Sequence, residues 1–197
     1  MRLFGSILLT TLAATPTFAF AASVYRNTHF GVVLNDSGLP VQNKEVGSYI
    51  PPQTYLGSST ETLLTLYVKP SVYEGTNLEN GSLRLSAKTM LRQDDCYLYQ
   101  ATDGITIIAN HALNRIRRVQ GNSWHYTDPQ PLSGAALGHQ TMGELYRLYR
   151  NNICFEVVLQ LSTVSRANLA SPDSVKEVNT TKMFNYLGAA FNRLRIK

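Results

Sequence analysis

The chain has 197 residues, a formal net charge of +5, 44% hydrophobic residues and 16% charged residues. The hydrophobic content is ordinary for a globular protein and the charged content is a little low. The length is that of one domain with a core that needs no metal to support it. The net charge is small, and the sequence lacks the dense basic stripe of a nucleic-acid-binding domain. We therefore expect no nucleic acid partner.

Residues 1–21 have the composition of a cleavable secretory signal peptide. Arg2 gives a positive start, an apolar stretch covers residues 3–14, and Ala19-Phe20-Ala21 offers the small residues that a signal peptidase accepts. The alternative, a transmembrane anchor, needs about 20 predominantly apolar residues, and this stretch is shorter. We therefore predict a signal peptide, a single soluble domain over residues 22–197 without a transmembrane segment, and a periplasmic or secreted location.

The first half of this domain alternates between strand-like runs and loops. Residues 30–34, 61–68 and 82–88 predict strands. Residues 35–60 and 70–81 have the composition of irregular connections, the second with a turn at Asn80-Gly81. The apolar run 105–108 fits either a strand or part of a helix.

Two β-hairpins are predicted in the second half. The first joins residues 114–119 and 123–127 through Gln120-Gly121-Asn122, and the second joins residues 141–150 and 153–163 through Asn151-Asn152. In the last run one face is apolar and the opposite face mixes polar and apolar residues. We therefore expect that opposite face to be partly covered.

Residues 181–191 predict an amphipathic helix that Asn179 or Thr180 caps, and residues 194–196 add a brief closing strand. A sheet with an open apolar face needs a cover, and this helix supplies one. The fold class that we predict is α+β, an antiparallel β-sheet covered by helices, including this C-terminal helix.

The two cysteines, Cys96 and Cys154, favour a single disulfide in an oxidising compartment. That bond would close a loop of about 58 residues and contribute roughly 4 kcal/mol on the chain-entropy model. A pair of buried free thiols is the alternative. Neither cysteine has another cysteine or a histidine at ligand spacing, so we expect no metal and no cofactor.

The C-terminal part of the chain carries several motifs together. Tyr146-Arg147 precedes a turn, Cys154-Phe155-Glu156 opens a strand, and the final helix ends in Phe191-Asn192-Arg193. With these motifs the chain resembles small exported bacterial proteins of unassigned function whose fold is similar to that of the extrinsic photosystem II protein PsbP. The resemblance implies an α/β/α sandwich around an antiparallel sheet, and it implies no catalytic residue.

Arginines and aromatic residues of the two hairpins predict a binding patch. Arg115 and Arg117 share one face of their strand, and Trp124 and Tyr126 likewise share one face of theirs. The predicted members are Arg115, Arg117, Trp124, Tyr126, Arg147 and Arg150. Such a surface binds carbohydrate, anionic lipid headgroups or an acidic protein. The alternative is that these arginines, with Arg118, only keep a sheet edge soluble.

No established catalytic motif occurs in the sequence. The histidines, His29 among them, lack zinc-motif spacing, and no Gly-x-Ser-x-Gly motif is present. An enzyme would have to assemble its site from distant loops, drawing on His111, His125, His139, Asp94 and Asp103.

We therefore expect an exported accessory or binding protein without enzymatic activity. Its partner would be an exported protein or an anionic component of the envelope. Two alternatives stay open: a secreted or periplasmic hydrolase built from the distant residues, and an inhibitor of an exported enzyme that presents residues 131–139.

Overall fold

The computed structural model describes residues 24–42, 55–102, 107–133 and 138–197. The predicted signal peptide, residues 1–21, lies outside the described residues. Within them the chain forms an eight-stranded sheet, a three-stranded sheet and a two-stranded hairpin.

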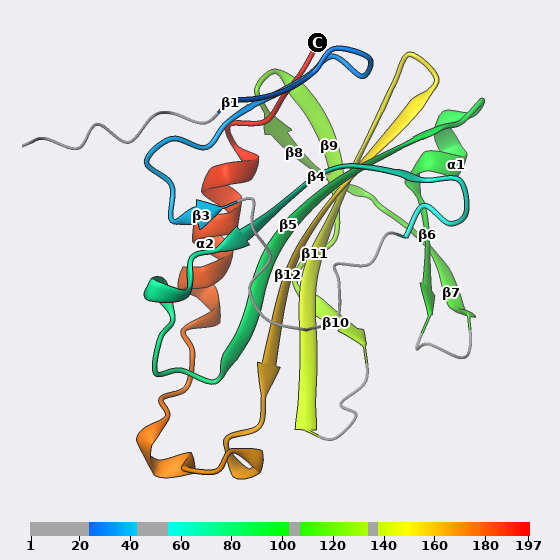
Figure 1. Ribbon diagram of the computed structural model, residues 1–197. Coiled ribbons are helices and arrows are strands. Elements are labelled where there is room, and N and C mark those ends of the chain that lie inside the picture. The colour runs from blue at the N-terminus through cyan, green and yellow to red at the C-terminus, as the bar shows by residue number, and fades with distance from the viewer. Residues whose placement is uncertain (1–23, 43–54, 103–106, 134–137) are drawn as a thin grey trace, which may run out of the picture.

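The eight-stranded antiparallel sheet runs through the centre of the molecule (Figure 1). Its order is β3-β4-β5-β12-β11-β9-β8, and β10 pairs with β11 beside this path. The strands are β3 (Val41–Gln42), β4 (Glu61–Val68), β5 (Leu78–Thr89), β8 (Arg115–Val119), β9 (Asn122–Tyr126), β10 (Gln130–Ser133), β11 (His139–Arg150) and β12 (Ile153–Val164).

Both predicted hairpins are confirmed. Strands β11 and β12 pair from Arg150↔Ile153 onward, and both turn residues, Asn151 and Asn152, have positive φ. This is the conformation of the two-residue turn that fits the twist of a hairpin. In the β8–β9 hairpin the turn is Gln120-Gly121, also at positive φ, because Asn122 already pairs with Val119.

Strand β5 contradicts the predicted turn at Asn80-Gly81, because it begins at Leu78 and runs through both residues. A side chain at Gly81 would start 2.9 Å from a methyl carbon of Val68 and 3.1 Å from one of Leu161. The glycine therefore reflects close contact with the neighbouring strands rather than a chain reversal. The predicted loop before it is shorter and includes a 3₁₀ turn at Pro70–Val72.

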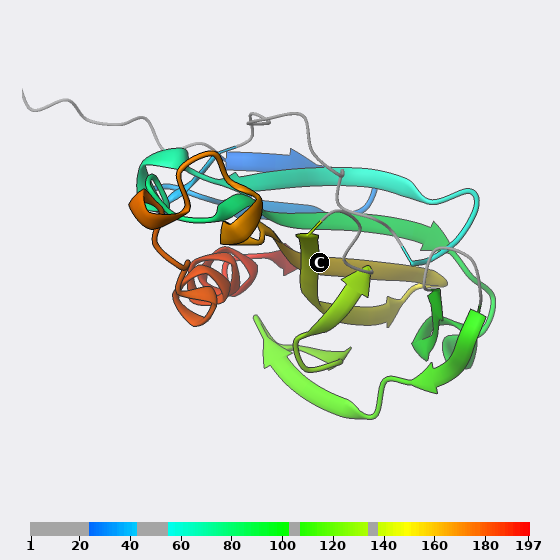
Figure 2. The ribbon, with the colours of Figure 1, turned by 90° about the horizontal axis from the view of Figure 1, so that it is seen from below.

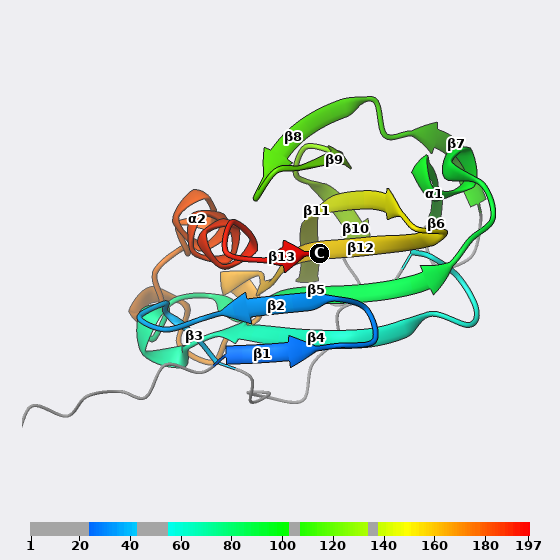
Figure 3. The same ribbon diagram turned by 90° about the horizontal axis from the view of Figure 1, so that it is seen from above.

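One face of the sheet carries the main hydrophobic core. Helix α2 (Thr180–Phe191) packs on it, and so does the three-stranded sheet β1-β2-β13. The strands of this small sheet are β1 (Val24–Asn27), β2 (Val32–Asn35) and β13 (Arg195–Ile196). Viewed end-on, β8 and β9 curl round so that α2 lies between them and the small sheet (Figure 3). The view from below shows the same curl (Figure 2).

Helix α2 begins at Thr180, one residue before the predicted start. The Asn179 side chain accepts a hydrogen bond from the Lys182 backbone N–H at 2.9 Å, so Asn179 is the cap. Leu187 and Phe191 are fully buried against the sheet. The ring of Phe191 meets Trp124 of β9 edge-on, with the centroids 5.1 Å apart.

The opposite face of the sheet is polar but buried. Its buried side chains include Ser82, Ser86, Glu156, Gln160 and Ser162. Leu113 and Leu132 cover one part of this face by packing on Leu145 and Val158. Helix α1 (Gln93–Tyr97) covers another part, and the hairpin of β6 (Leu98–Thr102) and β7 (Ile107–Ala112) follows it in the chain.

The predicted disulfide is confirmed. Cys96 of α1 is bonded to Cys154 of β12, with their Cα atoms 5.5 Å apart and both residues fully buried. The bond holds α1 on the polar face of the sheet.

The predicted fold class is wrong. The described residues contain two α-helices, and one of them, α1, has five residues, so the protein is a sheet-rich fold and not an α/β/α sandwich covered by helices. The physical reason lies in the cover of the polar face. A disulfide-tethered turn of helix and short strands cover that face, and the curl of the sheet around α2 leaves room for one long helix.

Candidate functional site

The outer face of the small sheet is where the candidate site begins. In β2 the side chains alternate, with Val32 and Leu34 buried and Val33 and Asn35 outward. In β1 the Tyr25 hydroxyl turns inward and donates to the Leu63 carbonyl at 2.5 Å. Residues of β1 on either side of Tyr25 therefore point outward, because successive strand residues face opposite sides.

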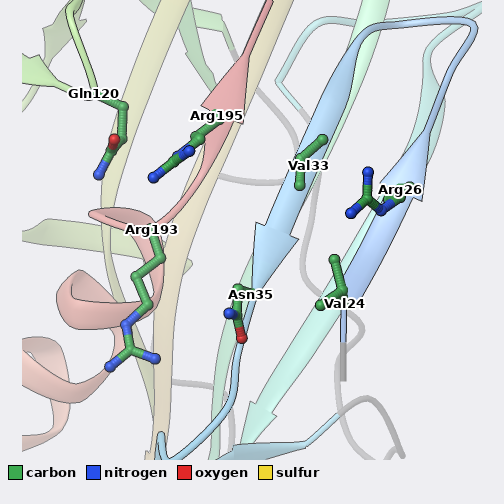
Figure 4. Close-up of a pocket in the computed structure, with 7 residues that line it drawn as sticks. All are labelled: Val24, Arg26, Val33, Asn35, Gln120, Arg193 and Arg195. Atoms are coloured by element: carbon green, nitrogen blue, oxygen red, sulfur yellow. The ribbon is translucent and has the colours of Figure 1, made fainter. Parts of the chain in front are cut away.

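The strand register aligns two arginines on this outer face. Arg26 of β1 and Arg195 of β13 both pair with Val33 of β2, so the three side chains form one row across the sheet. Two strand spacings separate the Cα atoms of the arginines by about 10 Å. Figure 4 shows the two guanidinium groups on opposite sides of Val33.

A groove of about 370 Å³ runs over this row (Figure 4). Arg193 and Gln120 line it on the side of Arg195, and Val24 and Asn35 line it on the other. No acidic side chain occurs among the described residues that line the groove.

The charges of the groove are uncompensated within the described part of the chain. None of the three arginines forms an ion pair there. Arg193 donates to the Ser37 carbonyl at 2.5 Å, and Arg26 and Arg195 are exposed at the surface. Guanidinium groups in this state bind phosphate or carboxylate oxygens, often with two parallel hydrogen bonds.

The C-terminal segment that carries Arg193 and Arg195 is held firmly. The Arg150 side chain donates to the Ile196 carbonyl at 2.9 Å and to the Asn122 side chain at 3.2 Å. The Lys197 backbone N–H donates to the Gly31 carbonyl at 3.0 Å, and Gln120 donates to the Asn192 carbonyl at 2.8 Å. Hydrogen bonds therefore anchor the backbone that carries two of the three arginines of the groove.

The predicted arginine and aromatic patch is only partly at the surface. Arg115 pairs with Asp128 and lies 5.0 Å from the ring centre of Tyr126. Arg117 donates to the Tyr146 hydroxyl at 3.1 Å and to the Asn192 side chain at 3.0 Å. The structure thus brings Arg117 and Arg150 to the C-terminal segment. Whether these surface residues bind a ligand stays a prediction.

Two predicted members of the patch, Trp124 and Arg147, do not lie at the surface, since each is 1% exposed. Trp124 is on the face of β9 that packs against α2. Arg147 is on the polar face of β11, directly opposite Glu156 of β12.

Arg147 has a structural role that the sequence did not predict. Its guanidinium donates to Glu156 Oε2 from Nε at 3.0 Å and from Nη2 at 2.8 Å. It also donates to the carbonyls of Tyr55, Cys96 and Leu98, at 2.7, 3.0 and 2.5 Å. All five N–H groups are used, so no donor is left for a ligand in the hollow of about 280 Å³ beside it.

The histidines named for a hydrolase do not converge. The His125 Nδ1 lies 2.6 Å from the Leu113 carbonyl, whereas the His139 Nδ1 lies 2.8 Å from Glu79. His125 pairs with Arg147, eight residues along β11 from His139, which places the two histidines about 27 Å apart. Asp94 is exposed on α1 near Arg92.

The other candidates from the sequence are His111, Asp103 and the predicted inhibitory loop. His111 lies in β7, and Asp103 lies outside the described residues. Residues 134–137 of the predicted inhibitory loop also lie outside them. Among the residues that the structure describes, no three His, Cys, Asp or Glu side chains are grouped as a metal site would require.

No described helix has the length and apolar character to span a membrane.

Comparison with family models, with curated proteins and with solved structures finds no match to this chain. The resemblance to exported PsbP-like proteins therefore stays a prediction, apart from the sandwich fold that the structure contradicts.

Arg26, Arg193 and Arg195 were not predicted as site residues. A signal was present in Arg193-Leu194-Arg195-Ile196-Lys197, where basic and apolar residues alternate as in a strand with a basic outer face. Arg26 also lies at an outward-facing position of a strand, β1. Only the tertiary fold brings it close to Arg195, because β1 and β13 both pair with β2.

Proposed function

We propose that this chain is an exported, non-enzymatic binding protein whose groove holds the phosphate-bearing headgroups of an anionic lipid surface. The observation that supports this most strongly is the set of three arginines, Arg26, Arg193 and Arg195, which line one groove without an ion-pair partner among the described residues. Cationic side chains near an anionic membrane contribute about 1 kcal/mol each to binding.

The apolar residues of the groove favour a lipid over a free anion. Val24 is 43% exposed, and Val33 lies between Arg26 and Arg195 in the cross-strand row. An inorganic anion gains nothing from these valines. An amphiphile, in contrast, places its charged group on the arginines and its apolar part on the valines.

Export is part of the proposal. The Cys96–Cys154 disulfide is compatible with an oxidising compartment, and the signal peptide predicted at residues 1–21 points the same way. His125 and His139 are too far apart to belong to one active site, which disfavours a hydrolase that uses both.

Vesicle sedimentation tests the proposal. The chain without residues 1–21 is mixed with vesicles of phosphatidylcholine alone or of phosphatidylcholine and phosphatidylglycerol in equal parts. We expect binding to the anionic vesicles alone, and weaker binding as salt is added. Failure to bind the anionic vesicles would contradict the proposal. Full displacement by inorganic phosphate at constant ionic strength would point to a site for a free anion and also contradict it.

A further inference from the structure

A second hollow lies between α2 and the strands β8 and β11, and its chemistry differs from that of the groove. It has a volume of about 180 Å³. Its lining residues are Arg117, Glu144, Phe184, Asn185, Gly188, Ala189 and Asn192. Both charge signs, two amides and an aromatic ring are therefore present around one small space.

Hydrogen bonds fix the charged groups of the hollow. The Tyr146 hydroxyl donates to Glu144 Oε2 at 2.5 Å and accepts from Arg117 at 3.1 Å. Arg117 also donates to Asn192 Oδ1 at 3.0 Å. A tyrosine hydroxyl carries its proton at neutral pH, and burial raises the pKa of Tyr146 further, so this hydroxyl remains a donor to Glu144. Fixed polar groups of this kind lose little entropy when a ligand binds.

Gly188 provides the second, independent observation. It lies in the interior of α2, where alanine favours the helical state more than glycine does. A Cβ atom at this position would meet no atom of the described residues within 4 Å, so packing within that part of the chain does not require glycine. Glycine in such a place allows a ligand to approach the backbone closely.

The polar groups define the chemical class of the ligand. Glu144 repels an anion and Arg117 repels a cation, whereas a hydroxyl group can accept from the guanidinium and donate to the carboxylate. Phe184 offers an apolar surface to carbon-bound hydrogens. The volume is below the roughly 300–1,000 Å³ of sites for drug-sized ligands, which limits the occupant to about one ring.

We infer that this hollow binds a single neutral sugar residue, with Arg117 and Glu144 on its hydroxyl groups and Gly188 beneath it. The inference does not depend on the anionic ligand of the groove. Asn192 lines the hollow and Arg193 lines the groove, so the two sites adjoin at consecutive residues.

Binding to an array of neutral glycans tests the inference, with affinity for the best glycan then measured by titration calorimetry. We expect binding of at least one neutral glycan, and a loss of tenfold or more in Gly188→Ala. The same substitution is expected to leave the melting temperature unchanged or to raise it. Thr181→Ala, at an exposed position in the first turn of α2, is the matched control and keeps the affinity.

Two further variants test whether a bound glycan occupies the hollow or the groove. Glu144→Gln is expected to weaken glycan binding, whereas Arg195→Glu, which disrupts the groove, leaves it unchanged. The inference is overturned if no neutral glycan binds, if Gly188→Ala binds as the wild type does, or if Gly188→Ala lowers the melting temperature. It is also overturned if Arg195→Glu abolishes glycan binding.

Discussion

Arg26 and Arg195 flank Val33 in one row across the small sheet, although 169 positions in the sequence separate them. Because both arginines pair with the same residue of β2, their positions are set by backbone hydrogen bonds and not by side-chain contacts. Substitutions of their guanidinium groups can therefore change binding without disturbing the fold.

Single neutral substitutions in this row should weaken binding to anionic vesicles. Arg26→Gln and Arg195→Gln are each expected to lower the affinity about fivefold, as the loss of about 1 kcal/mol per basic residue predicts. Quantitative vesicle sedimentation at low salt measures this. Arg92→Gln, which removes an exposed arginine near α1, is the control and should bind as the wild type does. If all three variants lowered the vesicle affinity equally, net charge alone would explain binding, and the assignment to the groove would be contradicted.

The buried pair of Arg147 and Glu156 should be important for stability. Arg147→Met leaves the Glu156 carboxylate buried without the guanidinium that contacts it, and we expect a loss of about 3–5 kcal/mol in the free energy of unfolding. Denaturant unfolding measures the change. The double variant Arg147→Met with Glu156→Leu should recover most of the loss, because an apolar pair needs no counter-charge. The exposed pair of Arg92 and Asp94 serves as control, with an effect below about 1 kcal/mol.

The disulfide and the buried arginine should be energetically coupled. Replacing both Cys96 and Cys154 by alanine is expected to cost about 2–4 kcal/mol, since the crosslink restricts a long loop of the unfolded chain. Arg147 donates to the Cys96 carbonyl. Loss of the disulfide therefore also leaves this hydrogen-bond acceptor less firmly held. A double-mutant cycle with Arg147→Met should show less than additive losses. Strict additivity would show that the disulfide and Arg147 act independently.

Stability should fall at alkaline pH because of Tyr146. Burial and the hydrogen bond to Glu144 raise the pKa of this tyrosine, and the facing Arg117 only partly opposes them. The unfolded chain releases the proton near pH 10 and the folded chain does not, so the stabilising contribution is constant below about pH 10 and is lost as the pH rises further.

The test is the slope of the free energy of unfolding against pH between pH 10 and 11. Tyr146→Phe should make this slope less steep by up to about 1.4 kcal/mol per pH unit. Tyr73, whose pKa burial also raises, keeps part of the slope in the variant. A wild-type slope that Tyr146→Phe leaves unchanged would contradict the assignment.

Local patterns in the sequence predicted the local structure well. Both hairpins follow from residues that tolerate positive φ at the turn, and the final helix follows from its apolar spacing and the Asn179 cap. The signal at Gly81 was misinterpreted because a glycine that allows two strands to approach closely has the same local appearance as one in a turn.

The overall architecture could not be predicted in the same way. Segments distant in the sequence cover the polar face of the sheet, and Arg147 donates there to carbonyls of residues 49 to 92 positions away. No periodicity in the sequence reveals such a cluster, so helices were expected where a disulfide-bonded turn and short strands provide the cover. For the same reason Arg147 was predicted at the surface and is found in the interior.

The candidate site shows the same limit. Arg115, Arg117 and Tyr126 could be grouped from the sequence because they lie within one hairpin, but they do not line the groove. Arg26 and Arg195, which do line it, become neighbours only when β1 and β13 pair with β2. Alternation in the last five residues signalled an exposed basic face, but it gave no indication of which strand would lie beside it.

The affinity of the charge-reversed double variant Arg26→Glu with Arg195→Glu for phosphatidylglycerol vesicles tests the central claim most directly. The variant must first show the far-UV circular dichroism and the melting temperature of the wild type. We predict that its binding to anionic vesicles falls to the level measured with neutral phosphatidylcholine vesicles. Binding that stays within twofold of the wild type would contradict the claim that this groove holds the anionic headgroup.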